Sequence, residues 1–187
     1  LHKEYRRQRQ MCIRDSLSTE LLYQLCLISQ LPAHAPLRSE QVWARPDNPF
    51  LLSYVVYHHF RSLGWVVKNG TKFCVDYLLY KRGPVFSHAE FSVLIIPEYE
   101  DERDAQTSPF SQHHNAGEKS WVWFSTMNRV NSQVQKTLIL THVLVPSIAR
   151  LGLLEQPQQL VKSLQVDRSY QVTEVAIRRW VPARMKA

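Results

Sequence analysis

Apolar residues recur with a helical period in two segments of the N-terminal third of the chain. The first segment spans residues 17–29, where Ser18 is a candidate N-cap. Its apolar positions are Leu21, Leu22, Leu25 and Ile28. Residues 31–41, which follow, carry two prolines and are typical of a linker.

The second helical segment is predicted to begin at Pro49 and to end at about Leu63. Either Asp47 or Asn48 can cap it, and a proline suits the first helical turn. Gly64 is expected to terminate it. Its apolar face consists of Leu52, Val55, Val56 and Phe60.

From residue 65 onward the chain is rich in β-branched and aromatic residues. This composition predicts three antiparallel strands, at 65–68, 72–80 and 89–96. Asn69-Gly70 indicates a tight hairpin turn between the first two strands, and Arg82-Gly83-Pro84 indicates a second turn.

The second half of the chain begins with residues 97–120, which are polar and lack periodicity, and therefore predict a long loop. This loop carries the acidic residues Glu98, Glu100, Asp101, Glu102 and Asp104, a run that is usually solvated. Ser125 is expected to cap a short helix ending at about Val134. Residues 137–145 are nearly all apolar and predict a central strand, whereas 151–164 predict loop with some helix and 170–181 a last strand.

The order of these elements predicts an α/β fold of the mixed α+β kind. Residues 17–48 form a small N-terminal helical module with its linker, and residues 49–187 form the main domain. Because the chain begins with Leu1 rather than Met, we expect it to be a fragment. The segment 11–16 resembles a translated sequencing adapter, so we interpret residues 1–16 as an artefact or a disordered segment.

Charge and cysteine content narrow the classes of function. Lys and Arg total 23 and Asp and Glu total 16, a net charge of +7 that favours a polyanionic partner such as nucleic acid. Charge alone fits a merely basic protein equally well. The three cysteines form no CxxC pair, which disfavours a disulfide framework or a zinc site and favours a reducing compartment. No apolar run is long enough for a membrane span.

Several kinds of catalytic site lack support in the sequence. The chain has five glycines and no glycine-rich loop of the kind that binds phosphates. His58-His59 and His113-His114 are adjacent pairs, and neighbouring side chains point in different directions. No carboxylate cluster offers ligands for a two-metal nuclease, so we predict no metal site.

One motif contains side chains that could act in catalysis. Tyr80 is expected to end one strand and His88 to begin the next, across the Gly83-Pro84 turn. This arrangement brings a phenol and an imidazole to the same edge of a sheet. Taken alone the signal is weak, because a tyrosine at a strand end is more often a packing residue.

Residues 57–96 resemble the catalytic subunits of tRNA-splicing endonucleases. The residues that carry the resemblance are Gly64-Trp65, Lys72-Phe73, Asp76, Leu79-Tyr80, Gly83-Pro84 and His88-Ala89. Residues 128–140 resemble the lysine segment of this family, and 178–182 its C-terminal strand. The likeness is strongest to the eukaryotic Sen subunit that cuts the 5′ splice site, in its fungal form. The chain departs from the family at Cys74, where many members have glycine, and in the long loop 97–120.

The resemblance implies a restriction-endonuclease-like catalytic domain over residues 49–187, with a mixed sheet flanked by helices. It implies a catalytic triad of Tyr80, His88 and Lys136 that needs no metal or other cofactor. The reaction would be a transesterification by the RNA 2′-hydroxyl that leaves a 2′,3′-cyclic phosphate and a 5′-hydroxyl. Lys136 would supply the cation, His88 the acid and Tyr80 the base, although the last two roles could be exchanged.

The resemblance also implies an RNA-binding set and partners. Arg129 and Arg179 would sandwich an unstacked bulge base of the partner's substrate site, with Trp180 beside them. The substrate would be pre-tRNA. The partners would be a second catalytic subunit and two structural subunits in a heterotetramer, joined in part through the strand 170–181. Family members act in the nucleus or on the cytosolic face of the mitochondrial outer membrane.

Three other functions fit parts of the pattern. A non-catalytic structural subunit of the same complex would not need all three of Tyr80, His88 and Lys136. A tRNA-binding module would use the basic charge without cleaving RNA. A metal-dependent DNA nuclease of similar fold would lose its activity to a chelator.

Overall fold

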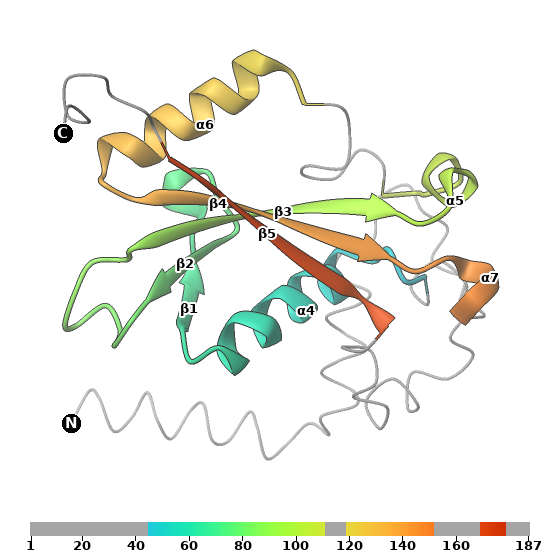
Figure 1. Ribbon diagram of the computed structural model, residues 1–187, viewed down its shortest axis with the longest axis horizontal. Helices are drawn as coiled ribbons and strands as arrows, with labels where there is room; N and C mark the ends of the chain where they lie inside the picture. Colours follow the sequence, from blue (N-terminus) through green and yellow to red (C-terminus); the bar gives the residue numbers. More distant parts are fainter. Residues whose placement is uncertain (1–44, 111–118, 152–168, 179–187) are drawn as a thin grey trace, which may run out of the picture.

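The chain forms a mixed five-stranded sheet in the computed structural model (Figure 1). The structure describes residues 45–110, 119–151 and 169–178. Outside these residues lie the predicted helix 17–29, the linker 31–41, residues 152–164 of the predicted loop, Arg179 and Trp180. The division of the chain at residues 16 and 48 therefore stays a prediction. No helix in the described ranges is long and apolar enough to cross a membrane.

The strands follow one another across the sheet in sequence order. They are β1 (Val66–Asn69), β2 (Tyr77–Tyr80), β3 (Phe91–Tyr99), β4 (Thr137–Val145) and β5 (Gln171–Ile177). β3 and β4 are parallel and every other neighbouring pair is antiparallel, so the predicted mixed sheet is confirmed. A parallel pair requires a crossover connection, and helix α6 (Trp121–Gln133) lies in it.

Helix α4 (Pro49–Ser62) is the predicted second helix, and its boundaries are nearly those expected. Asn48 is the cap, because its Oδ1 accepts a hydrogen bond from the Phe50 amide at 2.9 Å. Gly64 follows with a φ of +90°, a left-handed conformation that suits glycine after a helix end. All four residues of the predicted apolar face are buried.

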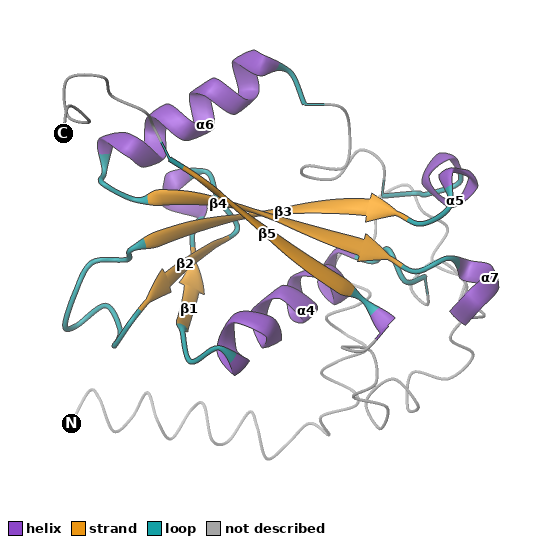
Figure 2. Ribbon diagram, viewed as in Figure 1, coloured by secondary structure: helices purple, strands orange, loops and turns teal. Residues whose placement is uncertain are grey.

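Helices cover both faces of the sheet (Figure 2). Successive side chains of each strand point to opposite faces, so the buried apolar residues form two separate clusters. On the α4 face, Val93 and Ile139 pack with Phe60 and its neighbours. On the α6 face, Leu94 and Leu138 pack with Trp123 and Met127. The central strands β3 and β4 are therefore buried on both sides, as the apolar run 137–145 predicted.

The predicted strand 72–80 is wrong over its first half. Residues Thr71–Phe73 form a short 3-10 helix, η1, and Cys74 is left-handed with a φ of 57°, so β2 begins only at Tyr77. Asn69-Gly70 is not a two-residue turn, since Gly70 has a φ of −104°. Position 70 is closely packed in this turn, since a Cβ on Gly70 would lie 2.5 Å from Cγ2 of Val75.

The predicted loop 97–120 is also partly wrong. β3 continues to Tyr99 because it pairs with β4 along its whole length, and helix α5 (Glu102–Gln106) follows. Two acidic residues of this segment hold the chain after β4. The Glu100 Oε2 accepts from the Ser147 amide at 3.0 Å, and the Asp104 Oδ2 accepts from the Ile148 amide at 2.9 Å, beside helix α7 (Ile148–Leu151).

The remaining differences concern element ends. Helix α6 begins four residues before Ser125, because the Ser120 Oγ accepts from the Trp123 amide at 3.2 Å and caps it. The strand expected at 89–96 begins at Phe91, and the strand expected at 170–181 is seen as β5. The strand expected at 137–145 is confirmed as β4 without change.

Candidate active site

The ends of three adjacent strands bring Tyr80, His88 and Lys136 to one end of the sheet. Tyr80 is the last residue of β2, His88 lies three residues before β3, and Lys136 directly precedes β4. Both parallel strands begin at this end, on the left of Figure 1.

The main chain of Glu90 joins the three segments. Its amide donates to the Leu79 carbonyl at 3.1 Å, and its carbonyl accepts from the Thr137 amide at 3.1 Å. Tyr80 and Lys136 are the direct neighbours of these two partners, and His88 is two residues from Glu90 itself. The backbone therefore gathers the three predicted residues, while their catalytic roles stay predictions.

An ordered turn separates Tyr80 from His88. Gly83 has a φ of +116°, which favours glycine, and its carbonyl accepts from the Phe86 amide at 3.1 Å and the Ser87 amide at 3.3 Å. Tyr80 is half-buried and packs against the apolar cluster on the α6 face, whereas His88 is exposed. The imidazole is thus open to a substrate and the phenol is held by packing.

The end of α6 fixes the backbone of Lys136. The Lys136 amide donates to the Asn131 carbonyl at 3.0 Å, and the Gln135 amide donates to the Ser132 carbonyl at 3.1 Å. Gln135 is left-handed, with a φ of 56°. This pattern is a Schellman motif, which ends the helix and turns the chain directly into β4.

The side chain of Lys136 has two contacts among the described residues. Its Nζ lies 3.4 Å from the Val134 carbonyl oxygen and 4.7 Å from the centroid of the Phe73 ring. No carboxylate in the described ranges pairs with it. Because no described carboxylate competes for it, the ammonium is available to an anionic ligand.

Arg129, the first residue of the predicted RNA-binding set, is exposed on α6. It lines an open groove on that helix together with Ser125, Asn128, Ser132 and Gln133. The other two members of the set, Arg179 and Trp180, lie outside the described residues, so the structure shows one side of the expected base-binding pair.

The chemistry available at this end of the sheet is that of a phenol, an imidazole and an ammonium. These groups can act as base, acid and electrostatic stabiliser in acyl or phosphoryl transfer. Within the described residues, no three His, Cys, Asp or Glu side chains are grouped so that they could hold a metal ion.

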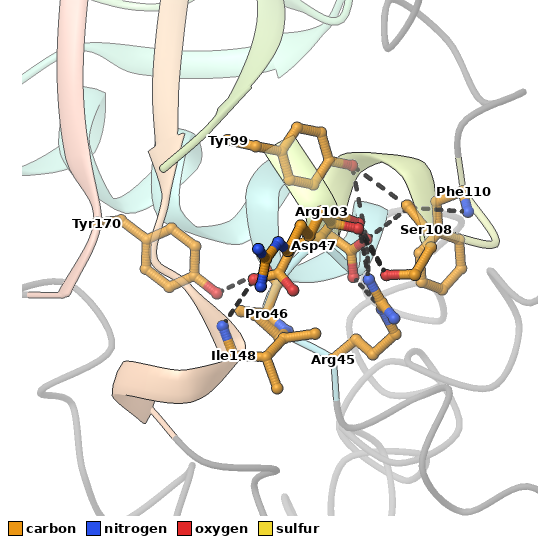
Figure 3. Close-up of polar contacts among 11 residues, drawn as sticks. Arg45, Pro46, Asp47, Tyr99, Arg103, Ser108, Phe110, Ile148 and Tyr170 are labelled. Atoms are coloured by element: carbon orange, nitrogen blue, oxygen red, sulfur yellow. Dashed lines mark hydrogen bonds and ion pairs between the residues drawn. The ribbon is translucent and has the colours of Figure 1, made fainter. Parts of the chain in front are cut away.

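A polar cluster at the opposite end of the sheet was not predicted from the sequence (Figure 3). The Asp47 carboxylate is 2% exposed and accepts from Arg45 Nε at 3.0 Å and from Ser108 Oγ at 2.5 Å. The Tyr170 hydroxyl donates to the Pro46 carbonyl at 2.6 Å. Asp47, a candidate helix cap in the sequence, lies in this cluster instead, and Asn48 is the cap. The cluster anchors residues 45–47 to the domain and brings no nucleophile or acid–base pair to the surface.

Comparison with known proteins identifies the same family as the motif resemblance. Residues 50–147 match the tRNA intron endonuclease, catalytic C-terminal domain. The chain is 44% identical over 143 residues to the probable tRNA-splicing endonuclease subunit sen2 of Schizosaccharomyces pombe, which covers 74% of this chain and 34% of that protein. It is 40% identical over 140 residues to subunit SEN2 of Saccharomyces cerevisiae, covering 73% of this chain and 31% of that protein.

The likeness extends to animals. The chain is 32% identical over 170 residues to the tRNA-splicing endonuclease subunit Sen2 of Rattus norvegicus, covering 89% of this chain and 33% of that protein. The chain thus spans about a third of the length of the curated relatives it matches. Fungal relatives have the higher identities, as the resemblance predicted. With the motif residues at one end of the expected mixed sheet and the catalytic domain matched over residues 50–147, the chain belongs to the tRNA intron endonuclease family.

Proposed function

We propose that this chain supplies the catalytic domain of a tRNA-splicing endonuclease subunit that cleaves pre-tRNA at the 5′ splice site. The observation that carries the proposal is the convergence of Tyr80, His88 and Lys136 on the main chain of Glu90. The names of the relatives, all subunits of a tRNA-splicing endonuclease, support the substrate and the reaction.

The proposed reaction uses the nucleophile that RNA carries. The 2′-hydroxyl oxygen attacks the adjacent phosphorus, the bond from phosphorus to the 5′-oxygen breaks, and the products are a 2′,3′-cyclic phosphate and a 5′-hydroxyl. The proton of the 2′-hydroxyl passes to a base, and an acid protonates the leaving 5′-oxygen. Because the nucleophile belongs to the substrate, the protein needs to supply only proton transfer and charge stabilisation.

Each residue of the triad suits one of these tasks. Lys136 would stabilise the negative charge that builds on the phosphate oxygens, since no carboxylate in the described ranges neutralises it. Histidine is the side chain that most often transfers protons in enzymes, so the exposed His88 is the better acid. Tyr80 is then the base, and the exchange of these two roles is the alternative.

Substrate binding and assembly extend the proposal. Arg129 would stack on one side of an unstacked base at the partner's substrate site and Arg179 on the other, with Trp180 beside them. The word subunit in the names of the relatives supports a complex, which we propose to be a heterotetramer with a second catalytic subunit and two structural subunits. We propose that it acts in the nucleus, with the cytosolic face of the mitochondrial outer membrane as the alternative.

The test is cleavage of an intron-containing pre-tRNA by the complex reconstituted with its partner subunits, in EDTA, with wild-type chain and with His88→Ala. The wild type is expected to leave a cyclic phosphate at the 5′ splice site, and His88→Ala is expected to abolish that cut while RNA binding persists. A substrate with a 2′-deoxy nucleotide at the cut is the matched control and should resist cleavage.

Either of two results would contradict the proposal. A 5′ cut that persists in His88→Ala assigns this chain to a structural or tRNA-binding role in the complex. A cut that requires a divalent metal, or that proceeds on the 2′-deoxy substrate, contradicts transesterification by the 2′-hydroxyl.

A further inference from the structure

We propose that the ring of Phe73 is a positioning residue that holds the ammonium of Lys136 in place for the reaction. The inference rests on the proposed function, because it assigns a task to a residue beside the candidate catalytic lysine. Lys72-Phe73 is one of the motifs that carry the family resemblance, and neither the triad nor the RNA-binding set gives it a role.

The geometry of the contact is that of a cation–π interaction. Lys136 Nζ lies 4.7 Å from the centroid of the Phe73 ring, inside the limit of about 6 Å at which the face of an aromatic ring attracts a cation. The Val134 carbonyl, 3.4 Å from Nζ, is a second and longer contact. Two contacts restrict a side chain that otherwise rotates about four bonds.

The ring can serve as a platform because its own backbone is fixed. The Phe73 amide donates to the Gly70 carbonyl at 2.8 Å, and the Cys74 amide donates to the Thr71 carbonyl at 3.1 Å. The ring is half-buried against the apolar cluster on the α6 face. Tyr80 packs against the same cluster, so two of the three candidate catalytic residues depend on one packed support.

The chemistry of a phenyl ring suits this task better than that of a carboxylate. A carboxylate at the same distance would position the ammonium but would also neutralise the charge that the phosphate needs. The face of the ring attracts the cation through its quadrupole and carries no net charge. Phe73 therefore restricts Lys136 without competing with the substrate.

A structural role for Phe73 would depend on the volume of the ring, whereas a positioning role depends on the attraction of its π electrons for the Lys136 ammonium. The test replaces Phe73 with phenylalanines that carry one, two or three fluorine atoms, which progressively weaken the attraction of the ring face for a cation at nearly constant size. The complex is reconstituted with its partner subunits, and single-turnover cleavage of pre-tRNA is measured together with the KM.

We expect the cleavage rate constant to fall in steps, reaching a loss of about two- to fivefold at three fluorines, with the KM unchanged. Phe91 is the matched control, because it is a half-buried phenylalanine that lies edge-on to Trp65 on the other face of the sheet. The same fluorine series at Phe91 should leave the rate constant unchanged. Thermal unfolding of each variant confirms that the fold is kept.

The outcomes separate the two proposals. If the unmodified complex cleaves and the Phe73 series is flat, or if the Phe91 series falls as steeply, the positioning role is wrong and the proposed function stands. If the unmodified complex does not cleave, the proposed function is wrong and the positioning role is wrong with it.

Discussion

At the scale of single residues, the turn that places Lys136 is built on an unfavourable conformation. The backbone of Gln135 is left-handed, a conformation that costs residues other than glycine roughly 1–2 kcal/mol. Helices that end in this motif usually have glycine at this position. The two hydrogen bonds from Gln135 and Lys136 to the last turn of α6 offset the cost.

Replacement of Gln135 with glycine should therefore stabilise the protein. We expect Gln135→Gly to raise the free energy of unfolding by about 0.5–1 kcal/mol, because the left-handed strain is removed while glycine adds entropy to the unfolded chain. The measurement is urea unfolding of the two proteins at neutral pH. A lower midpoint for Gln135→Gly would show that the side chain makes a contact worth more than the strain.

A matched control lies two residues away. Gln133 is exposed and is the last residue of α6, where the backbone is helical. The same replacement there should lower the free energy of unfolding by up to about 1 kcal/mol. Opposite signs at Gln133 and Gln135 would tie the effect to the conformation of the backbone rather than to the loss of a glutamine.

At the scale of elements, Asp76 joins β2 to β3 at the point where their pairing stops. The Asp76 Oδ2 accepts from the Ile95 amide at 2.8 Å, and the Asp76 amide donates to the Val93 carbonyl at 3.0 Å. Ile95 is 7% exposed, so water cannot readily replace this acceptor.

Loss of this acceptor should destabilise the sheet. We expect Asp76→Ala to lower the free energy of unfolding by about 1–3 kcal/mol, since it leaves a buried amide without its partner. Asp76→Asn keeps an oxygen acceptor at the same position and should cost less. Urea unfolding measures the loss, and hydrogen exchange at the Ile95 amide locates it. Equal losses in both variants would assign the effect to the charge instead.

The phenol of Tyr77 links β2 to helix α4 and makes stability depend on pH. Its hydroxyl donates to the Ser53 carbonyl at 3.0 Å, and burial raises its pKa above the ordinary value of about 10. The folded state thus favours the protonated phenol. The contribution to stability is complete below about pH 10 and is lost as the pH rises through the higher pKa of the folded state.

We therefore expect the free energy of unfolding to fall as the pH rises above about 10, by a smaller amount in Tyr77→Phe than in the wild type. The slope should persist in part, because burial also raises the pKa of Tyr99, which the variant retains. Urea midpoints across this range measure both slopes. The prediction is wrong if the two proteins lose stability in parallel.

The elements that could be predicted from the sequence are those with strong local signals. Helix α4 has a cap, a proline in its first turn and an apolar stripe, and β4 is a continuous apolar run. The errors lie where strand pairing and close packing decide, rather than local propensity. β3 extends to Tyr99 because of parallel pairing with residues far along the chain, and residues 71–74 form a turn in which Gly70 lies close to Val75.

The same distinction holds for the candidate site. Tyr80, His88 and Lys136 could be predicted because each belongs to a short motif that the family resemblance covers. The contact between Lys136 and Phe73 could not be predicted, because 63 residues separate them and no local pattern pairs a lysine with a phenylalanine. The Asp47 cluster likewise joins segments that are distant in the sequence.

At the scale of the whole molecule, the two ends of the sheet differ in what they offer. The candidate active site lies where β2 ends and β3 and β4 begin, and the groove that Arg129 lines is on α6, the helix that precedes β4. The polar cluster around Asp47 occupies the other end, where Tyr99 ends β3 and where α5 lies. A basic chain of net charge +7 is expected to attract RNA through long-range forces.

Arg129 provides a test of whether RNA is held here by stacking or only by charge. Arg129→Lys keeps the positive charge but removes the planar guanidinium, so stacking on a base is lost while phosphate attraction is kept. We expect the affinity of the reconstituted complex for a 2′-deoxy, uncleavable pre-tRNA to fall about fivefold or more. The dependence of affinity on salt should stay the same, because the number of charges is unchanged.

The control for this substitution uses an arginine at the other end of the sheet. Arg103 is exposed on α5, and Arg103→Lys should alter neither the affinity nor its salt dependence. Binding titrations at several salt concentrations give both quantities for each variant. If Arg129→Lys binds as tightly as the wild type, Arg129 acts as a point charge on the phosphate backbone, and base stacking by its guanidinium is ruled out. If it binds more weakly and its salt dependence also becomes shallower, the lysine has lost a phosphate contact as well. A weaker affinity with an unchanged salt dependence is the result that only the stacking geometry predicts.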